Sequence, residues 1–300
     1  MTYKLYQLQF DSAHFGGGSL ELSELTFSAD RLFSALVLEA KKSNRLDQWM
    51  ELAQSDAFAL TDAFPYNLAP FLPKPIGFPS YEKFDQTKDA VTLRQEAKKT
   101  KKLDFMEYDF LADFLEGDII ESEKHSEQFI VTKNRPHVDG ALYQVGVTVP
   151  SSEGISLYII ASQSNLFDDL MTSLQFSGLG GKRTSGYGRF DLKILDLPSE
   201  LEARLTNDHP GLVMALTTSL PFDDELEKAM TGAKYLLKKS SGFAFSQDLE
   251  ENFRKQDLYK FKAGSTFQQT FKGQIVDVRP NDFPHPVWNY AKPLFYRLED

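Results

Sequence analysis

The alternation of hydrophobic and polar residues predicts a strand at the start of the chain, followed by a helix. Tyr3 to Phe10 alternates in the manner of a partly buried strand. Ser28 and Asp30 then provide a hydroxyl cap and a first-turn acid for a helix. The apolar stripe of this helix consists of Leu32, Phe33, Leu36, Val37 and Ala40. Five prolines between positions 65 and 79 predict an extended connector, because each removes a backbone donor and restricts the residue before it.

The middle of the chain continues the pattern with two strands, a helix and a further strand. Ala141–Val149 and Ile155–Ala161 are rich in β-formers, and Pro150–Gly154 between them has the composition of a hairpin turn. A helix is predicted over Asn165–Phe176 and a strand over Arg189–Leu195. The order strand, helix, two strands, helix, strand is the split βαβ arrangement of a ferredoxin-like fold.

From Pro198 the pattern starts again as a less regular mixture of strands and helices. A short helix comes first, and Asp223–Met230 has a second helical pattern. The predicted strands are Leu212–Leu220, Lys234–Lys238, Asp257–Lys262, Gln274–Val278 and Val287–Arg297. We therefore expect an α+β protein of two domains, residues 1–197 and 198–300, both within the usual size range of domains. A highly charged insertion at about 80–140 interrupts the first domain.

Composition narrows the class of protein. The hydrophobic fraction of 41% is typical of a globular chain, and no apolar run is long enough to cross a bilayer, so we expect no membrane insertion. Met1 leads directly into Thr2-Tyr3-Lys4 without the pattern of a secretory signal. Because the chain has no cysteine, disulfides, thiolate chemistry and Cys-ligated metals are excluded. We expect a cytoplasmic protein.

The formal net charge of −10 argues against a polyanion partner only if the charge is evenly spread. It is not: the acidic block Asp104–Glu127 has nine carboxylates against the single Lys124, so the block carries −8 and the remaining residues only −2. The basic run Lys98–Lys102 lies just before it. Such a run is usually a solvated face, and contact with nucleic acid is the alternative. The acidity of the chain therefore does not exclude RNA.

The strongest local signal is the glycine-rich loop Gly178–Gly188. Its five glycines lie together with Lys182, Arg183, Ser185 and Tyr187. Glycines let backbone N–H groups approach an anion, the two bases neutralise it, and the tyrosine offers a stacking face, so phosphate binding is one interpretation. A flexible turn with solvated bases is the other. The spacing fits neither a P-loop nor a dinucleotide-binding fingerprint.

A second glycine-rich loop, His14–Gly18, follows the first predicted strand. The ring of His14 is able to contact a phosphate or a base, or to act as a general acid or base. A structural hydrogen bond is an equally good interpretation of a lone histidine. The sequence leaves open whether the two glycine loops reach one site.

The residues that catalysis or metal binding would need are missing or unsuitably spaced. None of the five histidines lies at ligand spacing from another histidine or a suitable carboxylate, and there is no Gly-x-Ser-x-Gly motif. Asp223–Glu225 lies at a predicted helix N-terminus, where the macrodipole favours carboxylates, so we interpret it as a cap rather than a catalytic pair. We expect neither a metal nor a cofactor.

The glycine loop and several other segments resemble a known family. The sequence from Gly178 to Phe190 resembles the signature loop of the RAMP superfamily of CRISPR-associated proteins. Further segments are similar, in the same order, to one branch, the Csm-type subunit that caps the 5′ end of the guide in type III-A effector complexes. These segments are Ser28–Leu36, Phe71–Ile76, Lys234–Phe243, Ala263–Ser265 and Pro284–Trp288. The resemblance covers nearly the whole chain, and the ordered set selects the branch.

The resemblance implies two ferredoxin-like (RRM-like) domains, with a protruding β-hairpin thumb in the charged insertion. It implies an RNA-binding subunit that holds the 5′ handle of a CRISPR RNA in antiviral defence. It also implies docking to the large polymerase/cyclase-like subunit on one side and to the first backbone RAMP subunit on the other. The RNA-binding residues carried over are His14, Gly16, Gly17, Lys182, Arg183, Ser185, Tyr187, Lys238, Lys239, Phe243, Gly264, Ser265 and His285.

Two other functions stay open beside this one. The backbone subunit cuts RNA with an Asp after its first strand, but residues 11–27 offer Asp11, Glu21 and Glu24 without a matching motif. Relatives that process RNA use a histidine base, for which His14 is the only candidate. We favour a subunit without catalysis, with a His14-dependent endoribonuclease as the alternative. An RNA-independent scaffold whose acidic block docks partners is the third hypothesis, whereas in an RNA-binding subunit the block is expected to face away from the guide.

Overall fold

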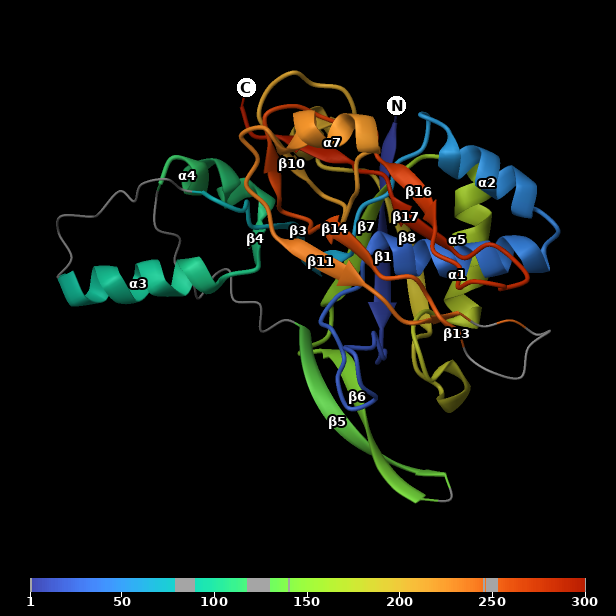
Figure 1. Cartoon of the computed structure of the whole chain (residues 1–300). Helices are drawn as coiled ribbons and strands as arrows, with labels where there is room; N and C mark the ends of the chain where they lie inside the picture. Colours follow the sequence, from blue (N-terminus) through green and yellow to red (C-terminus); the bar gives the residue numbers. More distant parts are fainter. Residues whose placement is uncertain are drawn as a thin grey trace.

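The computed structural model describes residues 2–78, 90–117, 130–139, 141–244, 246 and 253–299. The chain contains both helices and strands, so the predicted α+β class is confirmed (Figure 1). Within the described residues, no helix combines the length and the apolar character that crossing a membrane requires.

A six-stranded sheet in the order β4-β3-β2-β7-β1-β8 forms the centre of the first half. Every neighbouring pair in it is antiparallel. β7 is buried along its whole length between β1 and β2. The strands are β1 (Tyr3–Phe10), β2 (Phe64–Asn67), β3 (Ala69–Pro73), β4 (Phe105–Glu107), β7 (Ser156–Ser162) and β8 (Phe190–Leu195).

The predicted hairpin between Ala141–Val149 and Ile155–Ala161 is wrong. The first run forms β6 (Ala141–Pro150), which pairs along its length with β5 (Ile130–Asp139). The second run lies in β7, and both edges of β7 are already occupied by β1 and β2. The true partner, β2, comes from the proline-containing stretch predicted as a connector. The expected succession of strand, helix, two strands, helix, strand is therefore present, with β2 in the third position.

Three helices of the first half supply large side chains to one hydrophobic cluster. Phe33, Trp49 and Phe167, one from each helix, are fully buried in it. The rings of Trp49 and Phe167 stack with centroids 6.0 Å apart. These helices are α1 (Ala29–Lys42), α2 (Leu46–Gln54) and α5 (Asn165–Ser177), so the predicted helices at Ser28 and Asn165 are confirmed.

The two strands β5 and β6 form an arm that projects from the body (Figure 1). Before the arm, the described part of the charged insertion contains α3 (Ala90–Lys102), β4, the 3-10 turn η1 (Tyr108–Phe110) and α4 (Leu111–Leu115). Residues 79–89, 118–129 and 140 of the predicted insertion lie outside the described residues, as does the later part of the acidic block. The arm extends to Pro150, ten residues past the predicted end of the insertion.

The second half has one four-stranded sheet, β15-β10-β18-β9, and short two-stranded pairs. The predicted helix α7 (Asp223–Met230) is confirmed. The remaining elements are α6 (Ser199–Arg204), β9 (Leu205–Thr206), β10 (Val213–Ala215), β11 (Leu237–Ser240), β12 (Phe243–Ala244), β13 (Phe253–Arg254), β14 (Leu258–Phe261), β15 (Thr266–Phe267), β16 (Gln274–Asp277), β17 (Trp288–Ala291) and β18 (Phe295–Arg297).

The two halves share a hydrophobic core. One cluster joins Leu5 and Tyr158 of the first sheet to Met214, Leu216 and Tyr296 of the second half. A second contact joins the halves: Tyr290 of β17 packs against Phe33 of α1, with ring centroids 5.4 Å apart. The domain boundary expected at residue 197 stays a prediction, and the halves are packed against each other across it.

Candidate nucleic-acid interface

Three segments meet where the arm joins the body. They are the first loop (residues 11–27, after β1), the base of the arm, and the glycine loop Gly178–Gly188. Ala13 and Thr148 exchange two backbone hydrogen bonds of 2.9 and 2.7 Å, which fasten the arm to the first loop. The N–H groups of Gly181 and Gly188 donate to the carbonyls of His14 and Ser12. The two glycine loops, whose relative position the sequence left open, therefore lie side by side.

Glycine is required here because backbones approach each other closely. A Cβ on Gly188 would lie 2.1 Å from the carbonyl oxygen of Leu179, and one on Gly146 of the arm 2.3 Å from that of Glu21. Many N–H groups of the glycine loop also donate within the protein, namely those of Gly178, Leu179, Gly181, Ser185, Gly186 and Gly188. The expectation that the loop offers a cradle of backbone N–H groups is wrong at these positions. An anion at this loop would be held mainly by side chains.

Four cations gather at the base of the arm, and we call them the arm-base cations. Arg183 is exposed on the 3-10 turn Arg183–Ser185, together with Ser185. Within the described part of the chain, its side chain makes neither an ion pair nor a hydrogen bond. Lys182 is half-buried, with its ammonium 4.8 Å from the centre of the Tyr143 ring and 3.2 Å from its hydroxyl.

The other two arm-base cations, Lys133 and Arg135, come from β5 and were missed by the sequence analysis. Their side chains are exposed. They pair in register with Val147 and Val145, so all four side chains lie on one face of the arm. That face also packs against Tyr187 of the glycine loop. Lys133 and Arg135 are two residues apart, as are side chains on one face of a strand, and this spacing could have indicated them.

Two predicted RNA-binding side chains are buried at this site. Tyr187 is 6% exposed and packs in the valine cluster of the arm, so the expected stacking face is wrong. The tyrosine packs the glycine loop against the arm. His14 is 7% exposed, and its Nδ1 lies 2.7 Å from the carbonyl oxygen of Gly146. The geometry of His14 is that of the structural hydrogen bond considered beside the catalytic interpretation.

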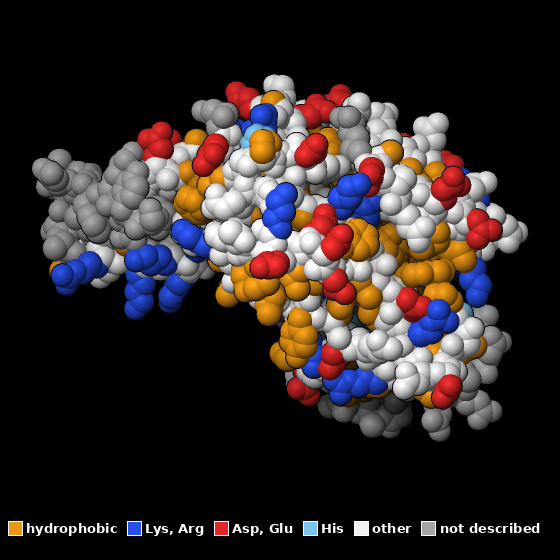
Figure 2. Space-filling model, turned by 45° about the horizontal axis from the view of Figure 1, so that its top comes forward, with side chains coloured by type: hydrophobic (Ala, Val, Ile, Leu, Met, Phe, Trp, Pro, Cys, Tyr) orange, Lys and Arg blue, Asp and Glu red, His pale blue; other side chains and the backbone are white. Residues whose placement is uncertain are grey.

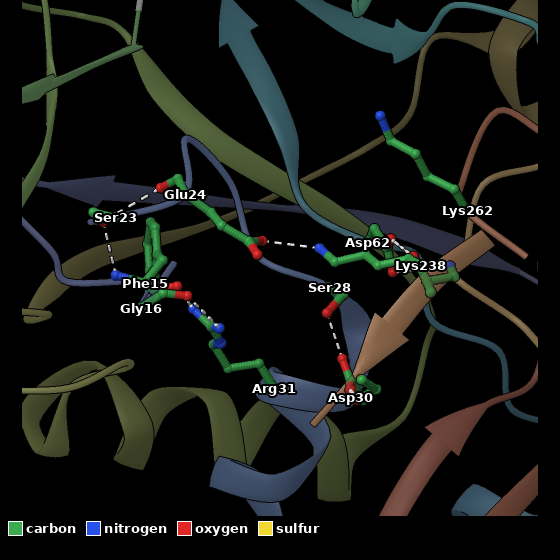
Figure 3. Close-up of polar contacts among 12 residues, drawn as sticks. Phe15, Gly16, Ser23, Glu24, Ser28, Asp30, Arg31, Asp62, Lys238 and Lys262 are labelled. Carbon is green, nitrogen blue, oxygen red and sulfur yellow. Dashed lines mark hydrogen bonds and ion pairs between the residues drawn. The ribbon is translucent and has the colours of Figure 1, made fainter. Parts of the chain in front are cut away.

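Gly16 and Gly17 belong to the bend of the first loop. The carbonyls of Phe15 and Gly16 accept hydrogen bonds from the guanidinium of Arg31 on α1 (Figure 3). The N–H of Gly17 donates to the carbonyl of Leu22 at 2.9 Å. These contacts fix the path of the first loop beside the glycine loop.

The predicted residues of the second half lie elsewhere, and most contact other protein groups. Lys238 forms an ion pair of 2.9 Å with Glu24 of the first loop (Figure 3), and Lys239 one of 2.7 Å with Asp257. The hydroxyl of the fully buried Ser265 donates to the carbonyl of Lys262. The carbonyl of Gly264 accepts a hydrogen bond from the N–H of Ile76, and its own N–H donates to the carbonyl of Ala215. Lys238 and Gly264 therefore contact the first half, whereas Lys239 and Ser265 are held by groups within the second half.

Phe243 and His285 are the remaining members of the predicted set. Phe243 is 67% exposed and is therefore available to a partner. His285 is half-buried, with its ring against Phe283 at 4.8 Å and its Nδ1 3.1 Å from the carbonyl oxygen of Pro286. The structure brings neither of them into contact with the arm-base cations.

A buried polar network, which we call the junction, joins the start of α1 to β11, β14 and β17. The carboxylate of Asp30 lies 3.1 Å from the Lys260 ammonium, whose side chain is 1% exposed. Ser240 and Asn289 also donate to Asp30, at 2.8 and 2.9 Å. Burial alone would raise the pKa of the Asp30 carboxyl, but Lys260 and the donated hydrogen bonds hold it well below its usual range.

Asp62 caps α1 in place of the expected Ser28 hydroxyl. Its carboxylate accepts from the N–H of Ala29 at 2.8 Å and from the Thr218 hydroxyl at 2.5 Å, while the Ser28 hydroxyl donates to Asp30. Burial raises the pKa of the Asp62 carboxyl. Both carboxylates act as structural acceptors between the halves. Among the described residues, no group of three His, Asp or Glu side chains is arranged to hold a metal ion.

Comparisons with a family model and with known proteins agree on one family, and the known proteins match over the whole chain. The model of the CRISPR Csm4 C-terminal domain matches residues 210–298. The chain is 58% identical over 299 residues to the CRISPR system Cms protein Csm4 of Streptococcus thermophilus, with 100% of both chains covered. It is 36% identical over 314 residues to the protein of that name from Mycobacterium tuberculosis, with 100% of this chain and 99% of the relative covered.

Solved structures show a similar fold. A chain of the crystal structure of the Csm3-Csm4 subcomplex in the type III-A CRISPR-Cas interference complex matches with a TM-score of 0.64 at 18% identity, over 98% of each chain. A chain of the Csm1-Csm4 cassette in complex with AMPPNP matches with a TM-score of 0.62 at 16% identity, over 100% of each. At these identities the likeness concerns the fold alone.

Proposed function

The chain belongs to the Csm4 family of CRISPR proteins, and from that premise we propose that it is the subunit that holds the 5′ handle of a CRISPR RNA in a type III-A effector complex. In this proposal the chain works in the cytoplasm in antiviral defence. It binds RNA without cleaving it and needs neither a metal nor a cofactor.

The observation that carries the proposal is the gathering of the arm-base cations. Lys133, Arg135 and Arg183 are exposed and Lys182 is half-exposed, although the chain has a net charge of −10. The described part of the acidic block, β4 to α4, lies away from the arm (Figure 1). Phosphates are recognised through such clustered Lys and Arg side chains, whose positive charge displaces counterions from the RNA backbone.

In the same proposal the arm is the thumb that wedges between nucleotides of the handle. The strand order β8-β1-β7-β2, with α1 and α5 as the crossover helices, supports a ferredoxin-like interpretation of the first half. The second half is then a degenerate copy, with one four-stranded sheet and short strand pairs. Each ferredoxin-like unit would contribute loops to the RNA surface, with Phe243 as the exposed aromatic of the second.

The protein partners are proposed from the relatives. Structures of related proteins are described as a Csm3-Csm4 subcomplex and a Csm1-Csm4 cassette. We therefore propose that this chain contacts a backbone RAMP subunit on one side and the large polymerase/cyclase-like subunit on the other.

The competing function is a RAMP-family endoribonuclease with His14 as its general base. Its buried ring and its contact with the Gly146 carbonyl support a structural role instead. The test is incubation of the purified chain with labelled repeat RNA, with and without divalent metal. We expect intact RNA. Cleavage by the wild type that disappears in His14→Ala would establish the endoribonuclease.

The RNA-independent scaffold is separated from the proposal by a binding measurement. We expect the purified chain to bind an RNA carrying the 5′ handle more tightly than an RNA of equal length with the handle scrambled. The complex with both protein partners should show the same preference. Equal affinity for the two RNAs, in the chain and in the complex, would contradict handle recognition and leave the scaffold as the better account.

A further inference from the structure

Helix α3 carries a row of cations outside the site described above. Arg94, Lys98 and Lys102 follow one another at intervals of four residues, so they lie along one face of the helix, about 6 Å apart along its axis. All three are exposed, as are the neighbouring Lys99 and Lys101. Figure 2 shows Lys and Arg side chains of this helix in a row along one edge of the molecule.

The opposite side of α3 is fixed to the protein. Ala97 and Thr100 are 7% and 6% exposed. Lys74, which follows β3, donates from its ammonium to the carbonyls of Thr100 and Lys101 at the end of the helix. Because the buried positions and these contacts set the rotation of the helix, the row of cations is held facing outwards.

Among the described side chains, no carboxylate forms an ion pair with this row. Within the described residues, Arg94, Lys98, Lys99 and Lys102 make neither an ion pair nor a side-chain hydrogen bond. Like charges four residues apart destabilise a helix. The helix dipole favours cations in the last turn, which accounts for Lys99 and Lys102, but Arg94 and Lys98 lie before it. An external anion would relieve this repulsion.

We propose that this row binds the phosphate backbone of single-stranded RNA. The inference rests on the proposed function only in taking RNA as the ligand of the chain. Lysine is depleted at protein–protein interfaces, which depend on apolar anchors, and the only exposed apolar residue among the described side chains of α3 is Val91. Interfaces with nucleic acid are, in contrast, strongly positive.

The row forms a surface separate from the arm-base cations. Figure 1 places α3 at one end of the molecule, away from α5 and β8, which flank the glycine loop. Lysine ammonium groups act as point charges without base readout, so the contact is expected to be independent of RNA sequence. It would extend the RNA path beyond the handle.

The test uses the full chain and a uridine oligonucleotide as the probe. Lys98→Gln with Lys102→Gln removes two cations and keeps good helix formers. If both bind phosphates, affinity should fall on the order of 20-fold at about 0.1 M salt, and the slope of log K against log salt should become shallower by about 1.4. Lys41→Gln with Lys228→Gln, exposed cations on α1 and α7, is the matched control and should leave both quantities unchanged. The same fold-loss is expected in a Lys182→Gln, Arg183→Gln background, because separate sites contribute independently.

Each other outcome has a definite meaning. Unchanged affinity and salt slope in the Lys98, Lys102 variant would overturn the proposal. So would weaker binding to purified Csm1 or Csm3 with unchanged RNA affinity, because the row would then be a protein contact. If the wild type binds the uridine oligonucleotide through the row but shows no preference for the handle, the proposed handle function fails and the row stands.

Discussion

Two groups of cations in this chain differ in what surrounds them. At the base of the arm, Lys133, Arg135 and Arg183 are exposed. In the second half, Lys238, Lys239 and Lys260 each face a carboxylate, at 2.9, 2.7 and 3.1 Å. In the sequence, Arg183 and the pair Lys238 and Lys239 both lie close to a glycine and an aromatic residue. The contrast shows that the local carboxylates, rather than the count of Lys and Arg, decide which cations remain available to an external anion.

The largest expected effect is at the junction. Lys260→Met leaves the Asp30 carboxylate buried without its cation, so we expect the free energy of unfolding to fall by about 3–5 kcal/mol. Urea unfolding measures it. Arg183→Met, at an exposed arm-base position, is the control and should change stability by less than about 0.5 kcal/mol. A loss of under about 1 kcal/mol for Lys260→Met would mean that the pair is not the structural element described here.

The next effect concerns the glycine loop. Gly188 has φ +84°, and a Cβ there would lie 2.1 Å from a carbonyl oxygen, whereas Gly154 has φ +88° and open space around it. Both alanine variants suffer the strain of a positive φ, but only Gly188→Ala also forces two backbones apart. We expect Gly188→Ala to lose about 1–3 kcal/mol more than Gly154→Ala in urea unfolding. Equal losses would contradict the close approach of Gly188 to Leu179 within the glycine loop.

The junction also predicts a pH dependence. Because the pKa of the Asp30 carboxyl is lower in the folded chain than in the unfolded one, Asp30 stabilises the fold above about pH 4. This contribution is lost progressively as the pH falls below about 4. The wild type should lose stability relative to Asp30→Asn by at most about 1.4 kcal/mol per pH unit below pH 4. Parallel stability–pH curves for the two proteins would show that Asp30 does not titrate in this way.

The smallest expected effect is on RNA affinity, when the tyrosine that contacts a lysine ammonium is replaced. Tyr143 lies 4.8 Å below the Lys182 ammonium at the arm base, and Tyr259 lies 5.8 Å from that of Lys239. Tyr143→Leu should weaken RNA binding about two- to fivefold, because it releases Lys182 from its position. Tyr259→Leu should have no effect on RNA affinity. Equal RNA affinities for the two variants would contradict a role of Tyr143 in positioning Lys182 for RNA.

Local features of the fold could be predicted from the sequence, whereas strand pairing could not. The apolar stripes of α1 and α5 and the pattern of Asp223–Met230 identify helices because helical periodicity is a property of neighbouring residues. The partner of β7 is β2, which lies far away along the chain and contains Pro65. A turn-like Pro150–Gly154 therefore suggested the wrong hairpin.

The candidate site was predicted in the same uneven way. Lys182 and Arg183 were identified from the glycine loop, but Lys133 and Arg135 were missed because β5 was not predicted. The burial of Tyr187 against the arm and the pairing of Lys238 with Glu24 depend on contacts between distant segments. Lysine is rarely buried, so no local signal pointed to Lys260.

The most direct test of the account is the salt dependence of binding to an RNA that carries the 5′ handle. Two variants each remove two cations, Lys182→Gln with Arg183→Gln at the arm base and Lys238→Gln with Lys239→Gln beside the junction. The first should make the slope of log K against log salt shallower by about 1.4, and the second should leave it unchanged. Equal slopes for both variants, or a change only in the second, would contradict the claim that the arm-base cations hold the RNA.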